Sequence, residues 1–175
     1  MTDPIKKIGF RNGLFLGCLL ILFSTYINFY HLELLTNVWL GFSTIFVIIA
    51  FGILSILQTK SKLGGLITFK EAFSSYFFTI LVGNLLSTLY LLALYLFILS
   101  PETKAIILQG MRDFDVNLMK QNLMPDKNIN DTLEFYKTYD PFTVSIVLTG
   151  FIKYLLRDCL IGFLVALIFR NKRTL

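Results

Sequence analysis

Three ionisable residues interrupt an otherwise apolar stretch near the end of the chain. Lys153, Arg157 and Asp158 lie within residues 142–169, where almost every other side chain is apolar. A charged group inside a membrane is costly, so such residues indicate a functional site by default. At 1.5 Å per helical residue, Asp158 lies about 16 Å from Phe169 and Arg157 about 18 Å. Lys153, at about 24 Å, is close enough to the other membrane face for its amine to reach the headgroups.

Polar residues in the other apolar stretches fall at a similar depth. By the same arithmetic one layer contains Ser24, Asn28, Ser43, Thr44, Asn84, Ser87 and Thr88. We therefore predict a candidate polar site made of Lys153, Arg157, Asp158, Asn84, Ser87, Thr88, Asn28 and Ser24. Three interpretations remain open: hydrogen bonding that holds the helices together, charges that sit at the outer interface, and a ligand or ion site. Asp158 is the one carboxylate available there for a proton relay.

The elements that must position these residues are long and apolar. The 175 residues are 55% hydrophobic and 15% charged, whereas soluble domains are about 25% charged. Four segments have the roughly 20 apolar residues that a membrane span needs: 12–30, 36–57, 72–99 and 142–169. Continuous segments of this length are helices rather than barrel strands. The sequence predicts an all-α, single-domain bundle of four transmembrane helices over residues 1–175. It also predicts that the first span is not a cleaved signal peptide.

Basic residues predict the orientation of these spans. Lys and Arg occur before the first span, between the second and third, and after the fourth, whereas the first connection contains neither. The residues are Lys6, Lys7, Arg11, Lys60, Lys62, Lys70, Arg170, Lys172 and Arg173. Because cytoplasmic loops collect Lys and Arg, both termini are predicted to be cytoplasmic. The chain is predicted to lie in the bacterial cytoplasmic (inner) membrane, with residues 100–141 outside the cytoplasm.

The segment 100–141 has a helical pattern of its own. Pro101 and Glu102 are typical of a helix start. Apolar residues then recur at helical spacing until Pro125, and a second short helix is predicted over 131–139. This small amphipathic hairpin either packs on headgroups and helix ends or docks a partner protein.

Three glycines follow one another at intervals of four at the start of the first span. Gly9, Gly13 and Gly17 form a small-residue ridge that lets two helix backbones approach closely. The ridge predicts packing within the chain, with self-association as the alternative.

Other classes of function find little support in the residues. His31 and Glu33 form the one close pair suited to acid–base chemistry, and two residues do not make a mechanism. No metal site or cofactor is predicted, and no nucleic-acid partner is expected because the basic residues lie where topology needs them. Cys18 and Cys159 lie inside spans, so they indicate no disulfide framework.

Several local motifs carry a resemblance to a known family. Gly64-Gly65 is followed by ITFKEAF, in which Thr68 and Glu71 match a capping box. SPET at 100–103, DPF at 140–142 and RNKR at 170–173 complete the pattern. The chain resembles, over nearly its whole length, a bacterial family of small four-helix membrane proteins known as domain of unknown function 4199. The resemblance implies a single domain in the inner membrane and assigns no catalytic residues.

The sequence favours a non-enzymatic accessory, assembly or envelope-interaction protein. Its partners are then the lipid bilayer and another membrane or envelope protein, or a second copy of the chain. The alternative is a small oligomeric transporter or channel that uses the polar layer around Arg157 and Asp158.

Overall fold

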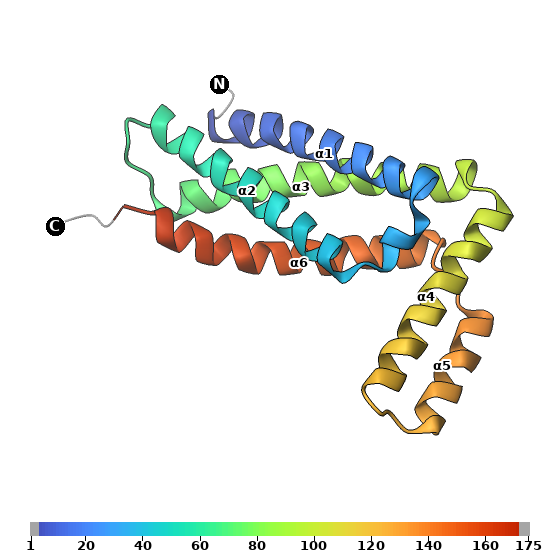
Figure 1. Cartoon of the computed structure of the whole chain (residues 1–175). Coiled ribbons are helices and arrows are strands. Elements are labelled where there is room, and N and C mark those ends of the chain that lie inside the picture. Colours follow the sequence, from blue (N-terminus) through green and yellow to red (C-terminus); the bar gives the residue numbers. More distant parts are fainter. Residues whose placement is uncertain (1–3, 172–175) are drawn as a thin grey trace.

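The computed structural model describes residues 4–171 and is all-helical over that range (Figure 1). Lys172 and Arg173, which contribute to the predicted orientation, lie outside the described residues. The helices are α1 (Pro4–Tyr30), α2 (Val38–Lys62), α3 (Phe69–Ala93), α4 (Pro101–Gln121), α5 (Asp126–Thr138) and α6 (Val144–Phe169). A 3₁₀ turn over Leu32–Thr36 joins α1 to α2, and a π-helical turn over Leu94–Ile98 continues α3.

Three of these helices are long and apolar enough to cross a membrane. They are α1, α2 and α3 extended through its π-helical turn to Ile98. The chain is therefore a membrane protein by the length and composition of its helices. The fourth predicted span corresponds to α6, which has 26 residues and carries Lys153, Arg157 and Asp158.

Local capping signals set several helix starts. Thr68 and Glu71 form the predicted capping box, in which each side chain bonds the other residue's backbone amide, and α3 begins directly after it. The Ser100 hydroxyl accepts from the Thr103 amide, so α4 begins at Pro101 as predicted. The Asn37 side-chain oxygen accepts from the Trp39 and Leu40 amides and caps α2 in the same way.

The four long helices run antiparallel to their chain neighbours, with α3 at the centre of the bundle (Figure 1). The start of α1, the end of α2, the start of α3 and the end of α6 therefore share one end of the bundle. Two hydrogen bonds close that end. The Asn171 amide donates to the Ile67 carbonyl, and the Ile67 amide donates to the Asn171 side chain, each at 3.0 Å.

The glycine ridge of α1 is its contact with α3. A Cβ on Gly9 would lie 2.7 Å from the Cβ of Phe78, and one on Gly13 would lie 2.7 Å from the Cβ of Val82. Gly17 is equally close to Leu86. Because glycine has no side chain, the backbones of α1 and α3 can approach closely at these positions. The pair makes the most extensive helix contact in the bundle.

The predicted hairpin consists of α4 and α5 and extends away from the end of the bundle opposite the termini (Figure 1). Its root is a small apolar core of Leu94, Leu99, Ile107 and Phe142. The second helix begins at Asp126 rather than at the predicted residue 131. The prediction of its start was wrong because it used Pro125 only as the end of the preceding helix. Proline is also favoured at a helix start, and α5 begins directly after Pro125.

Candidate functional site

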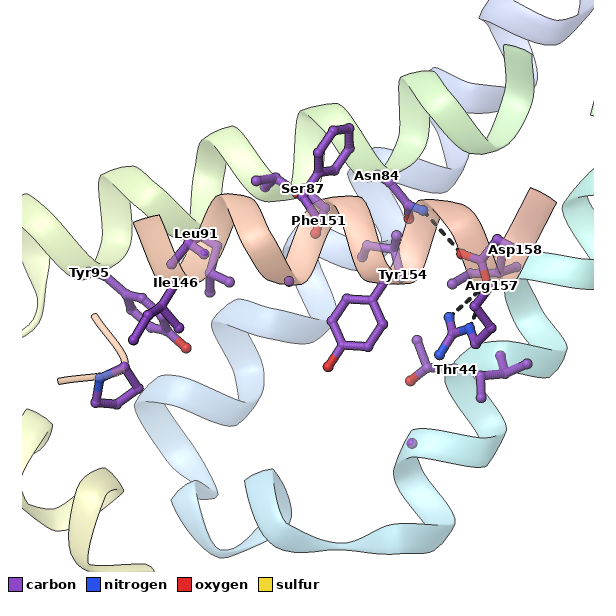
Figure 2. A pocket seen from close by; sticks show the side chains of 18 of the residues that line it. Thr44, Asn84, Ser87, Leu91, Tyr95, Ile146, Phe151, Tyr154, Arg157 and Asp158 are labelled. Atoms are coloured by element: carbon purple, nitrogen blue, oxygen red, sulfur yellow. Dashed lines mark hydrogen bonds and ion pairs between the residues drawn. The ribbon is translucent and has the colours of Figure 1, made fainter. Parts of the chain in front are cut away.

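Asp158 is a fully buried carboxylate in the middle of α6. Its side chain is 1% exposed, whereas that of the preceding Arg157 is 36% exposed. The guanidinium of Arg157 curls back along its own helix and donates from Nε to Asp158 Oδ1 at 2.8 Å. Its Nη2 lies 2.7 Å from the same oxygen (Figure 2). The two charges therefore neutralise each other within α6.

The other carboxylate oxygen is held by a neighbouring helix. Asn84 of α3 donates from Nδ2 to Asp158 Oδ2 at 3.1 Å. Each oxygen of the buried carboxylate thus has a hydrogen-bond partner, as burial of a charged group requires. The interaction also links α3 to α6 at mid-length.

A cavity of about 560 Å³ leads to this group. It lies between α2, α3 and α6, and Met111, Tyr139 and Pro141 border it at the hairpin end. Most of the lining is apolar. The polar side chains are Thr44, Asn84, Ser87, Thr88, Tyr95, Tyr139, Tyr154, Arg157 and Asp158, and the last two are the only charged residues among the described ones that line it. Its size and its few convergent polar groups are typical of small-ligand sites.

Arg157 is the group that a ligand in the cavity would meet. The guanidinium lies 5.1 Å from the ring centre of Tyr154, at cation–π distance. Thr44 of α2 faces the same space (Figure 2). With Asp158 already bonded by Arg157 and Asn84, the site can offer guanidinium and hydroxyl hydrogen bonds to a polar group. Both carboxylate oxygens of Asp158 already have partners among the described residues.

The structure brings together only part of the predicted polar layer. Arg157, Asp158, Asn84, Ser87 and Thr88 share the cavity. Ser24 and Asn28 do not line it, and the Asn28 amide instead donates to the Ser24 carbonyl within α1 at 2.9 Å. Lys153 is exposed on α6 and is not among the lining residues.

For Ser24 and Asn28, the depth calculation gives the height of a residue along its helix and not the direction of its side chain. α1 packs chiefly on α3 and, of its described residues, only Leu20 lines the cavity, so Ser24 and Asn28 lie outside it. Lys153 lies four residues before Arg157 and so shares its face of α6, but it is about one turn nearer the hairpin end and is exposed there.

A second buried polar cluster was missed by the sequence analysis. The Ser75 hydroxyl of α3 lies 2.7 Å from the Ser55 hydroxyl and 2.7 Å from the Thr59 hydroxyl, both of α2. All three side chains are essentially inaccessible. The spacing of Ser55 and Thr59, four residues apart in an apolar helix, is the signal that could have indicated a polar contact between spans.

Tyr76 packs next to this cluster between two glycines. A Cβ on Gly52 of α2 or on Gly162 of α6 would overlap the Tyr76 ring. The ring therefore fills the centre of the bundle, where α2, α3 and α6 meet. Its hydroxyl is buried and has no hydrogen-bond partner among the described residues.

Comparison with known proteins adds family membership and no activity. Neither the curated proteins nor the solved structures contain a match to this chain. A family model described as "Protein of unknown function (DUF4199)" matches residues 11–171. That range includes all of α2 to α6 and most of α1, and so both the polar cavity and the hairpin. The resemblance indicated by the capping-box motif and the flanking motifs is thereby confirmed, and the chain belongs to the DUF4199 family.

Proposed function

We propose that this protein crosses the bacterial cytoplasmic membrane four times, with α6 as its fourth span. The partnering of Arg157 and Asp158 supports this proposal, because it removes the net charge that would oppose insertion of α6. Lys153 is exposed and closer to the hairpin end, where its amine can reach the interface.

The sidedness of the proposal follows from the basic residues. One end of the bundle carries Lys6, Lys7, Arg11, Lys60, Lys62, Lys70 and Arg170. The positive-inside rule makes that end cytoplasmic, so the hairpin at the opposite end lies outside.

Cysteine labelling tests this topology. In a chain with Cys18 and Cys159 replaced by alanine, Lys127→Cys on the hairpin should react with a membrane-impermeant maleimide in intact cells. Lys70→Cys, at the other end, should react only after permeabilisation. Labelling of Lys70→Cys in intact cells contradicts the proposed orientation.

We propose that the protein is a non-enzymatic accessory protein that binds a membrane or envelope protein through α4 and α5. The observation that carries this proposal is the hairpin itself, which extends from the end of the bundle and exposes apolar side chains (Figure 1). It contacts the rest of the chain at its root and at the 3₁₀ turn Leu32–Thr36. The exposed apolar side chains are Leu118, Leu123, Met124, Leu133 and Phe135, with Leu123 90% exposed. Exposed apolar side chains on one short hairpin can offer an interaction surface.

Charge favours a protein partner over a lipid surface. The segment 100–141 holds five basic and seven acidic residues, a net charge of −2. Anionic headgroups repel such a segment and attract basic ones. A protein surface can combine an apolar patch with complementary charge at its rim.

Photocrosslinking in native membranes tests the docking role. A photoreactive residue at Leu123 and one at Phe135 should each capture the same protein partner, and Leu123→Asp should weaken capture from position 135. A probe at Phe46, a lipid-exposed position of α2 that is 70% exposed, serves as the control. Adducts from the hairpin that are the same as those from Phe46 argue against a docked partner.

The cavity favours a second candidate function, a small oligomeric transporter or channel. It places Arg157 and Asp158 at the end of a space that Met111 and Tyr139 border on the hairpin side. A space that ends at a charged pair inside the bundle is a feature expected of a path for a small polar solute. Fluxes of chloride and protons into proteoliposomes would test it, with Arg157→Leu and Asp158→Asn abolishing flux and Lys153→Leu as a matched control. A flux that is unchanged in all three variants rules out a role for the pair in transport of these ions.

A further inference from the structure

A second cavity lies at the opposite end of the bundle from the hairpin. It has a volume of about 780 Å³ and separates the first turns of α1 from the last turns of α2. Its walls are formed by Lys7, Phe10, Arg11 and Leu14 on one side and by Ser61 and Lys62 on the other, among other residues. We call it the basic groove.

The charge of the basic groove is one-sided. Lys7, Arg11 and Lys62 line it, and none of the described residues that line it is acidic. Three cations on two different helices repel one another across this gap. An anion in the groove would relieve that repulsion.

Arg11 is held in place with no acidic partner among the residues that the structure describes. Its Nη2 donates to the Gln58 Oε1 at 2.8 Å, so the acceptor is an amide and not a carboxylate. Asn12, which is 3% exposed, donates to the same oxygen from Nδ2 at 3.0 Å and fixes the orientation of Gln58. The guanidinium is thus positioned while its charge and its remaining N–H groups stay available, which is the form in which arginine binds phosphate.

The α1 side of the basic groove is cationic at one end and apolar further along the helix. Phe10 and Leu14 are 55% and 40% exposed and continue from the cationic end toward the middle of the span. An apolar surface directly below a cluster of cations matches a molecule with a phosphate head and an acyl chain. Basic sites between transmembrane helices on the cytoplasmic side are suited to anionic phospholipids.

We propose that the basic groove binds the phosphate headgroup of an anionic glycerophospholipid, with Lys7, Arg11 and Lys62 on the phosphate and Phe10 and Leu14 against an acyl chain. Gln58 acts as a positioning residue for Arg11. The proposal rests on the membrane location proposed above and places the lipid in the inner leaflet. The binding chemistry does not depend on the partner of the hairpin.

Lipid retention by the purified full chain tests the proposal. In nanodiscs containing equal amounts of phosphatidylglycerol, cardiolipin and phosphatidylethanolamine, native mass spectrometry should show retention of the two anionic lipids. The triple variant Lys7→Gln, Arg11→Gln, Lys62→Gln should lose at least about tenfold of that preference, since each cation near an anionic surface contributes appreciably. The matched control is Lys104→Gln, Lys120→Gln, Lys127→Gln, which makes the same charge change near or on the hairpin and should retain the preference.

Two further experiments test the identity of the ligand and the role of Gln58. Inorganic phosphate at millimolar concentration should not displace the lipid, whereas displacement together with equal binding of phosphate alone would assign the groove to free phosphate and overturn the lipid proposal. Gln58→Leu should weaken retention less than the triple variant does. If the triple variant does not fold, the single variants Lys7→Gln and Lys62→Gln, both of exposed residues, take its place. Retention equal to wild type in the basic-groove variants overturns the proposal, and because the assay uses purified protein this outcome is independent of the topology and crosslinking results.

Discussion

Asn84 of α3 and Asp158 of α6 form a hydrogen bond of 3.1 Å between two long helices, at a carboxylate whose other oxygen is bonded by Arg157. The contact joins residues 74 positions apart in the chain. It is the point at which the central helix of the bundle is tied to the one long helix that carries charges inside its apolar stretch. Loss of the Asn84 side chain therefore removes a hydrogen bond from a buried carboxylate as well as a contact between α3 and α6.

We expect Asn84→Ala to destabilise the folded protein by about 1–3 kcal/mol, because it removes one partner of a buried carboxylate. Denaturant or thermal unfolding in a mild detergent measures the change. Leu85→Ala is the control, since Leu85 is the next residue of α3 and is 45% exposed. A smaller effect at Asn84 than at Leu85 would show that water or lipid replaces the lost donor.

Alanine at Gly13 should separate α1 from α3. Its Cβ would lie 2.7 Å from the Cβ of Val82 and 2.8 Å from the Thr79 carbonyl oxygen, and overpacking of this kind typically costs about 1–3 kcal/mol. Gly110→Ala in α4 is the matched control, because nothing lies within 4 Å of the added Cβ. Alanine there should be neutral or stabilising, by up to about 1 kcal/mol. The two variants are compared by unfolding in the same detergent, and equal stabilities would contradict the close approach of α1 and α3.

The Ser55–Ser75–Thr59 cluster should behave as a unit. Ser75→Ala removes the hydroxyl that bonds both Ser55 and Thr59, although the Ser55 hydroxyl can still donate to the residue 75 carbonyl. It should cost about 0.6–1.7 kcal/mol, from the average to the largest value measured for hydrogen bonds between transmembrane helices. The double variant Ser55→Ala, Ser75→Ala should cost less than the sum of the single variants, because both remove the same bond. A double-mutant cycle in detergent measures this coupling, and strict additivity would show that the two hydroxyls do not interact.

Tyr136 links the two helices of the hairpin by donating from its hydroxyl to Asp115 Oδ2. Burial and this hydrogen bond to a carboxylate raise the pKa of Tyr136 above its usual value. A raised folded-state pKa means that the contribution to stability is complete below about pH 10 and is lost as the pH rises through the folded value.

Phenolate absorbance tests this prediction. The difference between wild type and Tyr136→Phe should develop only above about pH 10, the ordinary value for tyrosine. Asp115→Asn should move that difference to lower pH because it removes a negative charge beside the phenol. A Tyr136 signal at or below the ordinary value, with the helices intact by circular dichroism, would contradict the buried hydrogen bond.

The sequence by itself determined the elements and several of their boundaries. The length of the apolar stretches predicts the long helices, and three of them are confirmed as long and apolar enough to cross a membrane. The capping box at Thr68 and Glu71 and the start of α4 at Pro101 depend on residues a few positions apart, so they could be identified from local spacing alone. The hairpin was predicted because proline punctuates two amphipathic stretches, and family membership followed from short motifs.

Only the tertiary structure decided which polar residues meet. Residue spacing gives the height of a side chain along its helix, whereas its direction depends on which face of the helix packs and against what. Gly9, Gly13 and Gly17 turn one face of α1 onto α3, which leaves Ser24 and Asn28 outside the cavity although they lie at the predicted height. The gap between α2 and α6 brings Thr44 to the same space as Arg157. The contacts of Ser75 with Ser55 and Thr59, and of Gln58 with Arg11, likewise depend on how neighbouring helices are rotated, which no single helix specifies.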